Sequence, residues 1–439
     1  MVDRIVGKEV WDGLSSYGRS ITRVFDTLEL IVEKEIRHNF FSYKFSIITV
    51  LTTILILVSI FVMYRDYGLA RENYDILESL SSTAEDRSVV IPPTPLSIFA
   101  KGLDENLCRS HGLGWGRRIS ASSKQQSVND LFKLFTTPDL LYVIKVVLSL
   151  CAMLFAVDMV SGEKETGTLR QSLSGSLGRP ILIIGKWIGG FVSIILPLFI
   201  AVLLGTAFVT LQPSVEMSPQ NWARLGLFLL SSVVYLAVFF SLGLLISCLT
   251  HQTSSSLVVS LFAWTILVFL IPNLGNILAR QLVQIPTVQQ LELKRLQIAV
   301  KRQLVANQTK DYRERMEWLG RCDSEQDQLT ADYRNRFDRL VTLSQNITRI
   351  SPTASFTFLA TDLMGTGILE EGRLKSAVMQ YVFGSGNDED RSRPSFSYQR
   401  ASCREVLGRG GLNNLLILVL VNLLFFAATY VAFLRYDVR

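Results

Sequence analysis

Six long apolar runs dominate this chain of 439 residues and restrict the folds open to it. They cover residues 44–64, 139–157, 187–211, 225–249, 254–272 and 412–434. A helix of about 20 apolar residues crosses the hydrocarbon core of a bilayer, so these runs are long enough to span a membrane. The core of a soluble protein rarely supplies six such runs. We therefore predict an all-α polytopic membrane protein with six transmembrane helices.

The short loops between the runs predict the orientation of these helices. Residues 158–186, which we call the charged segment, carry Lys164, Arg170, Arg179 and Lys186. The next loop, residues 212–223, contains no lysine or arginine. Because positively charged loops stay in the cytoplasm, we expect the charged segment and both termini inside (N-in/C-in), including a short cytoplasmic tail at 435–439. The regions 65–138 and 273–411 then lie outside.

Residues 1–43 form a cytoplasmic region that is predicted to contain an amphipathic helix. The apolar positions that share one face of this helix are Phe25, Leu28, Val32, Ile36 and Phe40. Charged residues occupy the other faces. Such a helix either lies in the interface with membrane lipid or extends the first span.

The two external regions differ in character. Region 65–138 contains Pro92-Pro93-Thr94-Pro95 and is predicted to be a mostly irregular loop with a short helix or two. Region 273–411 is predicted to be largely helical, with a repeat of seven residues along 287–347. The repeat comprises Leu291, Ile298, Val305, Tyr312, Leu319, Gln326, Tyr333, Leu340 and Ile347. It predicts a long helix, or a helical hairpin broken near Gly320, that packs by one narrow face. A docking rod for an extracytoplasmic partner protein is the alternative.

The net charge and the cysteine content restrict the possible functions less than the apolar runs do. The net charge of +6 is spread along the chain and favours contact with lipid headgroups over nucleic acid. Two of the five cysteines, Cys151 and Cys248, fall in spans as packing residues. The other three, Cys108, Cys322 and Cys403, are predicted to be external, and their spacing selects no disulfide pair.

Motifs for catalysis are missing from the sequence. Gly185-Lys186 is the nearest approach to a phosphate-binding loop, but Pro180 replaces its first glycine and Trp187 its serine or threonine. The three histidines are far apart, and no H-E-x-x-H or G-x-S-x-G motif occurs. No acidic residue lies in the middle of a span, so proton-driven transport has little support. We predict no catalytic, metal or cofactor site, and expect energy to come from another protein.

The order of these parts resembles the ABC-2 type permeases, the membrane subunits of type-2 ABC exporters. An amphipathic helix precedes the first span, and the largest external region lies between spans five and six. Residues 161–170 read S-G-E-K-E-T-G-T-L-R, which is similar to the S-G-E-[KR]-x-x-G-T-L-[KR] stretch of the family. The chain ends F-L-R-Y-D-V-R, like members with enlarged external regions. The resemblance covers the six spans but not the detail of the external regions.

The resemblance implies a mechanism. A separate cytoplasmic ABC ATPase subunit would bind ATP and contact the charged segment, whose first part becomes a coupling helix. The residues that carry this expectation are Ser161, Gly162, Glu163, Lys164, Glu165, Gly167, Thr168 and Arg170. A second permease subunit, the same chain or a different one, would complete the pathway in the plasma or inner membrane. Gly185, Gly189 and Gly190 either permit close approach of helices or form a flexible loop end.

A membrane scaffold or sensor without transport activity is the alternative function. Its external helices would bind an extracytoplasmic protein, and the charged segment would pass the signal inward. The large, charged external region favours it, whereas the lack of any cytoplasmic domain beyond short loops speaks against it.

Overall fold

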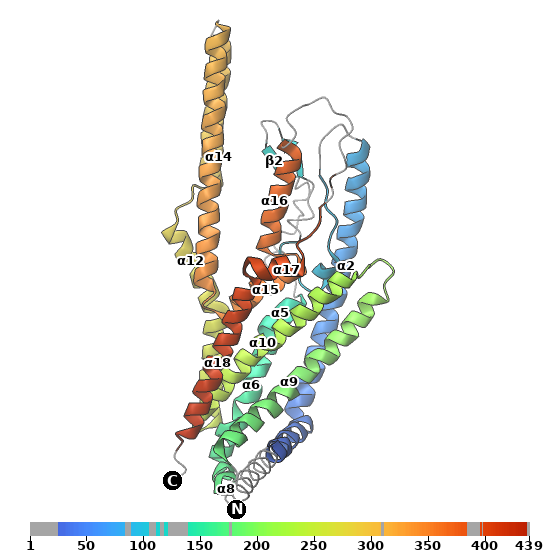
Figure 1. Ribbon diagram of the computed structural model, residues 1–439, viewed down its shortest axis with the longest axis vertical. Coiled ribbons are helices and arrows are strands. Elements are labelled where there is room, and N and C mark those ends of the chain that lie inside the picture. Colours follow the sequence, from blue (N-terminus) through green and yellow to red (C-terminus); the bar gives the residue numbers. More distant parts are fainter. Residues whose placement is uncertain are drawn as a thin grey trace, which may run out of the picture. The chain divides into compact units, whose positions relative to one another are not determined.

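The computed structural model describes residues 25–83, 89–104, 111–114, 118–121, 139–174, 178–308, 311–383, 396 and 398–436 (Figure 1). The chain divides into two compact units. Unit 1 comprises the described residues up to Thr265 and those from Ser355 onward, and unit 2 comprises Ile266–Ala354. Three predicted features lie at least partly outside the described residues: the first 24 residues, Cys108 and the tail beyond residue 436.

Six helices within the described ranges are long and apolar enough to cross a membrane. They are Tyr43–Ser79, Leu140–Glu165, Arg179–Thr210, Pro219–Leu249, Thr253–Leu282 and Cys403–Leu434. Each contains most or all of one predicted apolar run, so the all-α, six-span fold is confirmed. The helices extend past these runs because the flanking polar residues continue the helical backbone.

Helix α10 (Pro219–Leu249) is central to unit 1. It packs against α18 (Leu412–Leu434), α6 (Ser149–Ala156) and α11 (Thr253–Thr265). Its largest fully buried side chains are Phe228, Tyr235, Phe239 and Phe240. A helix that is apolar on all sides is typical of such a surrounded position. A second pair, α2 (Tyr43–Thr83) and α9 (Arg179–Thr210), packs side by side in Figure 1.

The second span is locally irregular at its start. Asp139 begins the short α5 (Leu140–Tyr142), which continues through a π-helical turn, η2 (Val143–Leu148), into α6. The Asp139 carboxylate accepts hydrogen bonds from the amides of Tyr142 at 2.7 Å and Lys101 at 3.0 Å. Asp139 therefore fixes the start of the span to the preceding segment.

The described part of region 65–138 contains regular elements that the sequence does not predict. Helix α2 continues to Thr83, well past the end of the apolar run. Two short antiparallel strands follow, β1 (His111–Gly114) and β2 (Arg118–Ala121), with Leu113 opposite Ile119. A predicted short helix is present at Pro95–Ile98. The extension of α2 and the strands were not predicted, because the charged residues after position 64 continue the helix and because short strands carry little hydrophobic pattern.

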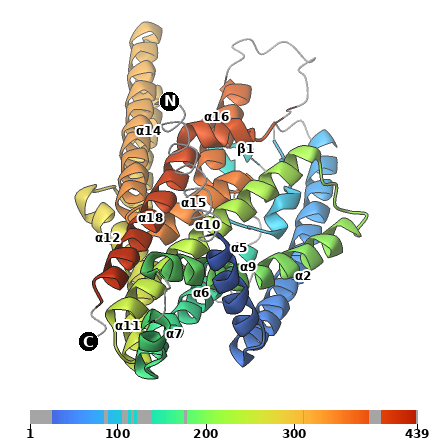
Figure 2. The ribbon, with the colours of Figure 1, turned by 60° about the horizontal axis from the view of Figure 1, so that its bottom comes forward.

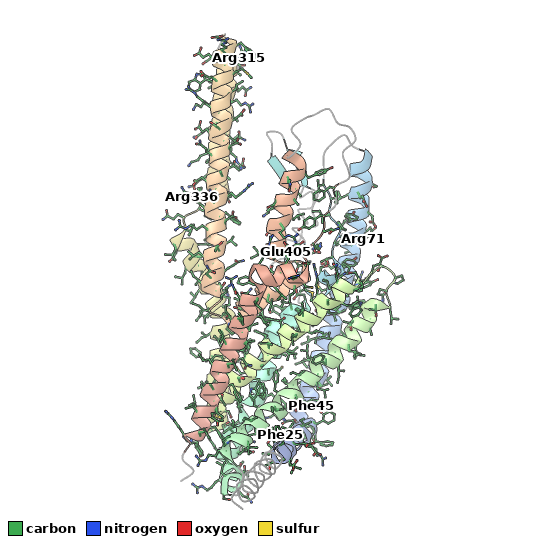
Figure 3. All side chains as sticks on the ribbon, viewed as in Figure 1. Phe25, Phe45, Arg71, Arg315, Arg336 and Glu405 are labelled. Carbon is green, nitrogen blue, oxygen red and sulfur yellow. The ribbon has the colours of Figure 1, made fainter. Side chains whose placement is uncertain are left out.

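The end of unit 1 that carries Arg71 and Glu405 is closed by short helices (Figure 3). They are η1 (Pro95–Ile98), α15 (Pro352–Met364), α16 (Ile368–Phe383), α17 (Cys403–Val406) and the π-helical η4 (Leu407–Gly411). Phe356 on α15 stacks on Tyr235 of α10 with ring centroids 4.3 Å apart. The Tyr398 hydroxyl donates to the buried Glu370 carboxylate at 2.8 Å. Burial, together with the negative charge of Glu370, raises the pKa of Tyr398.

Unit 2 contains η3 (Ile266–Leu270), α12 (Ile271–Leu282) and a helical hairpin of α13 (Val288–Gln308) and α14 (Tyr312–Thr348). Gly320 lies inside α14, so the predicted break at this glycine is wrong. The helices instead end and begin at Gln308 and Tyr312, and Tyr312 is exposed although the seven-residue repeat includes it. Two ion pairs link α13 with α14: Lys301–Glu325 and Arg302–Asp323, both at 3.3 Å.

The described cysteines are free thiols. Cys151, Cys248 and Cys322 are buried, and Cys403 is half-buried. The buried Cys322 packs within unit 2.

The stacked ring of Phe356 generates a stability prediction for unit 1. Phe356→Ala removes a fully buried ring from between α15 and α10, and we expect it to lower the free energy of unfolding by about 3–5 kcal/mol. Phe262→Ala, at a position that is 69% exposed, is the matched control. Thermal melting of the purified protein in detergent measures both. Equal melting temperatures for the two variants would contradict the packing described.

Candidate functional site

The charged segment is helical over most of its length and is not the loop that its polarity predicts. Helix α7 (Asp158–Glu165) follows α6, with Val157 between them in a helical conformation. Gly167 has a left-handed φ of 75° and turns the chain into α8 (Thr168–Ser174). Glutamate and lysine are good helix formers, so the span continues until this glycine permits the turn.

A buried ion cluster joins three helices at the α8 end of unit 1. Lys186 Nζ on α9 lies 2.7 Å from Glu163 Oε1 on α7 and 3.1 Å from Glu35 Oε1. Glu35 belongs to the N-terminal helix, which is described from residue 25 to residue 40. Lys186 is 2% exposed and Glu35 is 6% exposed. We call Glu35, Glu163 and Lys186 the ion cluster. Because a buried charge without a partner is costly, the cluster holds these helices together.

Two glycines of α9 let the N-terminal helix approach closely. A Cβ atom built on Gly185 would lie 2.5 Å from Ile31 Cγ2, and one built on Gly189 would lie 2.7 Å from Glu35 Cβ. Both distances are far below a carbon–carbon contact, so a larger residue would push the helices apart. Figure 2 shows the N-terminal helix, in dark blue, beside α9. Close helix approach is therefore confirmed here over a flexible loop end.

The buried face of the N-terminal helix is centred beside the predicted apolar face and includes part of it. Ile31, Glu35 and Asn39, which follow one another at intervals of four residues, are buried. Of the predicted apolar face, Phe25 (Figure 3) and Phe40 are exposed. Its other members, Leu28, Val32 and Ile36, are half-buried. The physical reason is that polar groups of α9 satisfy the buried polar side chains: Lys186 binds Glu35, and Asn39 Nδ2 donates to Ser193 Oγ at 3.4 Å.

The neighbours of Glu163 in the acid–base–acid sequence also bind inside the protein. Lys164 Nζ donates to the carbonyl oxygens of Cys248 and of Thr250, the latter at 3.0 Å, at the end of α10. The carboxylate of Glu165 accepts from the amide of Thr253 at 3.0 Å, at the start of α11. Charged side chains at helix ends satisfy backbone groups that have no partner within the helix. These side chains position α7 against the ends of its neighbours.

The remaining residues predicted for coupling divide into two groups. Ser161 is buried, and its amide donates a hydrogen bond to Ser247 Oγ at 2.9 Å. Gly162 packs near Thr253. By contrast, Gly167, Thr168 and Arg170 are exposed on the turn and on α8. We call the exposed group, with Thr166, the α7–α8 turn. It is the part of the charged segment that is open to another protein.

Sequence reasoning missed three residues that organise this end of the molecule: Glu35, Asn39 and Tyr436. Glu35 and Asn39 are not among the apolar positions from which the amphipathic helix was predicted. A glutamate and an asparagine four residues apart beside a Gly-x-x-x-Gly sequence in α9 were the available signal.

Within the ranges that the structure describes, no group of three histidine, cysteine or acidic side chains is placed to hold a metal ion.

Removal of the central charge tests the ion cluster. Lys186→Met leaves the buried carboxylate of Glu35 and the half-buried one of Glu163 without their cation, and we expect a loss of about 3–5 kcal/mol in unfolding free energy. Lys34→Met changes an exposed lysine on the N-terminal helix and serves as the control. Denaturation of both purified variants gives the comparison. A loss at position 186 no larger than that at position 34 would show that the cluster contributes little.

The glycine contact is tested at Gly189. Gly189→Ala forces the N-terminal helix away from α9, and we expect destabilisation of about 1–3 kcal/mol from overpacking. The control is Gly226→Ala in α10, where nothing lies within 4 Å of the added carbon. Both changes gain the same helix propensity, about 1 kcal/mol, so the difference in melting temperature isolates the steric term. A stabilised Gly189→Ala variant would refute the close approach.

Comparison with known proteins now places this arrangement of helices in a family. Residues 30–438 match the family model described as "ABC-2 family transporter protein". The chain is also similar to a protein from Stutzerimonas stutzeri, "Probable ABC transporter permease protein NosY", with 34% identity over 125 residues. That alignment covers 27% of this chain and 43% of the relative, and therefore less than half of the relative's length. Because the family model spans nearly the whole sequence, the chain belongs to the ABC-2 transporter family.

Proposed function

We propose that this chain is the membrane-spanning permease subunit of an ABC exporter and is driven by a separate ATPase. The observation that carries the proposal is the division of the charged segment. Its charges at positions 163–165 bind within the protein, whereas the α7–α8 turn is exposed. To transmit a movement of the ATPase, the segment needs an exposed contact surface that is attached to firmly packed helices, and it has both. The similarity to a probable ABC transporter permease supports the same conclusion.

Movement of the turn has a direct route to the spans. Helix α7 continues from α6, so displacement of α8 moves the second span. The ion cluster passes the same displacement to α9 and to the N-terminal helix, because Lys186 binds carboxylates on both partners. Rigid-body rotation of packed helices of this kind is a common mechanism for alternating between two states. We propose that closure of two ATPase subunits drives this rotation.

The same proposal assigns sides and partners. The α8 end faces the cytoplasm, because Lys164, Arg170 and Arg179 gather there. ATP binds to the partner subunit, and a second permease, identical or different, completes the pathway. The hairpin of α13 and α14 then lies outside the membrane, where its charged helices are available to an extracytoplasmic protein.

Co-purification with the candidate ATPase tests this function. Arg170→Glu reverses a charge on the exposed surface of α8 without touching the ion cluster. The loss of charge-assisted hydrogen bonds, about 1.5–3 kcal/mol, should lower the affinity for the ATPase about 10- to 100-fold. Arg313→Glu, an equal reversal on the exposed surface of unit 2, is the control and should bind as the wild type does.

The outcomes separate the exporter from the membrane scaffold. Retention of the ATPase by the wild type and by Arg313→Glu, with loss in Arg170→Glu, supports the permease. Failure of the wild type to retain any ATPase, or equal retention by all three proteins, would overturn the proposed coupling and favour a scaffold.

A further inference from the structure

The polypeptide that follows α18 folds back onto the charged segment. Helix α18 ends at Leu434, and Arg179 Nη1 donates to the carbonyl oxygens of Leu434 at 3.0 Å and Tyr436 at 3.2 Å. Carbonyl groups in the last turn of a helix lack partners within it, and a cation there also complements the helix dipole. Arg179 is the first residue of α9, so the end of α18 is tied to the far end of the charged segment.

The ring of Tyr436 contacts the near end of the same segment. Lys164 Nζ lies 4.6 Å from the centroid of this ring, within the range of a cation–π interaction. The same ammonium group binds the carbonyl oxygens of Cys248 and Thr250. His251 places its ring 6.4 Å from that of Tyr436. Lys164 therefore connects α7 to the end of α10 and to the segment after α18.

Helix α18 is joined to the rest of the bundle along its length. Asn422 Oδ1 accepts from Ser241 Oγ at 2.8 Å, and the Ser241 hydroxyl in turn accepts from Trp187 Nε1 at 2.9 Å. Thr429 Oγ1 donates to the carbonyl of Ser241 at 3.3 Å. These bonds connect α18 to α10 and α9, so a shift at its Tyr436 end is carried into the spans and not absorbed by a loose terminus.

From this geometry we propose that residues 434–436 act as a latch through which the charged segment moves α18. Tyr436 is the positioning residue of the latch, because its ring meets Lys164 and its carbonyl meets Arg179. The inference rests on the proposed coupling to an ATPase and extends it to the sixth span. Neither contact touches the exposed α7–α8 turn, so the latch serves transmission and not ATPase binding.

A double-mutant cycle on the permease alone tests the contact itself. Lys164→Met and Tyr436→Ala each lower the melting temperature, and the double variant should fall by clearly less than the sum, because the lost contact is shared. Tyr436→Phe keeps the ring and should melt as the wild type does. Additive falls in the double variant would show that Lys164 and Tyr436 do not interact, and would overturn the latch.

Hydrogen–deuterium exchange in the complex with the ATPase tests the role of the latch. Addition of ATP and vanadate to the wild type should change exchange in residues 158–174 and in residues 430–436 together. In Tyr436→Ala, the ATPase should be retained and residues 158–174 should respond, but the response of residues 430–436 should be lost. Tyr436→Phe should respond like the wild type.

Two results would contradict the latch while leaving the proposed function intact. One is a normal response of residues 430–436 in Tyr436→Ala, and the other is no response there in a wild-type complex whose charged segment does respond. If the wild type retains no ATPase, the proposed function fails and the transmitting role fails with it. The cycle on the isolated permease then still reports whether the contact exists.

Discussion

The ion pair that Lys186 forms with two carboxylates is the constraint on which this end of the protein depends. One ammonium group, almost inaccessible to solvent, binds Glu163 on α7 and Glu35 on the N-terminal helix. Burial of these charges is costly, and mutual attraction offsets the cost only while the geometry is kept. The N-terminal helix therefore cannot leave α9 without exposing the cluster, and α7 cannot shift alone. Gly185 and Gly189 are needed because they bring Glu35 within reach of Lys186.

This arrangement separates two roles within a short stretch of sequence. The charges at positions 163–165 fix α7 to the N-terminal helix, α9 and the ends of α10 and α11. The residues after Gly167 therefore follow a helix, α7, that is fixed to its neighbours. In the proposed function, a contact made at Arg170 is transmitted because the helix behind it is held by charges, and the proposed latch at Tyr436 extends that support to α18. A flexible, solvated loop would not transmit a displacement of α8 to the spans.

The sequence predicts the spans well because each apolar run is about long enough, as a helix, to cross the hydrocarbon core of a bilayer. The ten residues from Ser161 to Arg170 are enough to indicate the family. It does not predict the partners of the charges. Glu35 and Lys186 are 151 residues apart, and nothing local marks them as a pair. Polarity at positions 163–165 suggested a surface loop, whereas the helix continues and half-buries Glu163 and Lys164, and the exposed Glu165 binds the start of α11. In the hairpin, the repeat continued through Tyr312 by coincidence, which concealed the true break and suggested Gly320 instead.

Hydrogen–deuterium exchange of the Lys186→Met variant, without any ATPase, tests the central claim most directly. If the ion cluster unites three helices, exchange should accelerate together in residues 30–40 and 158–166, although neither stretch contains the substitution. Lys34→Met should leave both unchanged. Acceleration confined to residues near position 186 would contradict the account, because the N-terminal helix and α7 would then be held by other contacts.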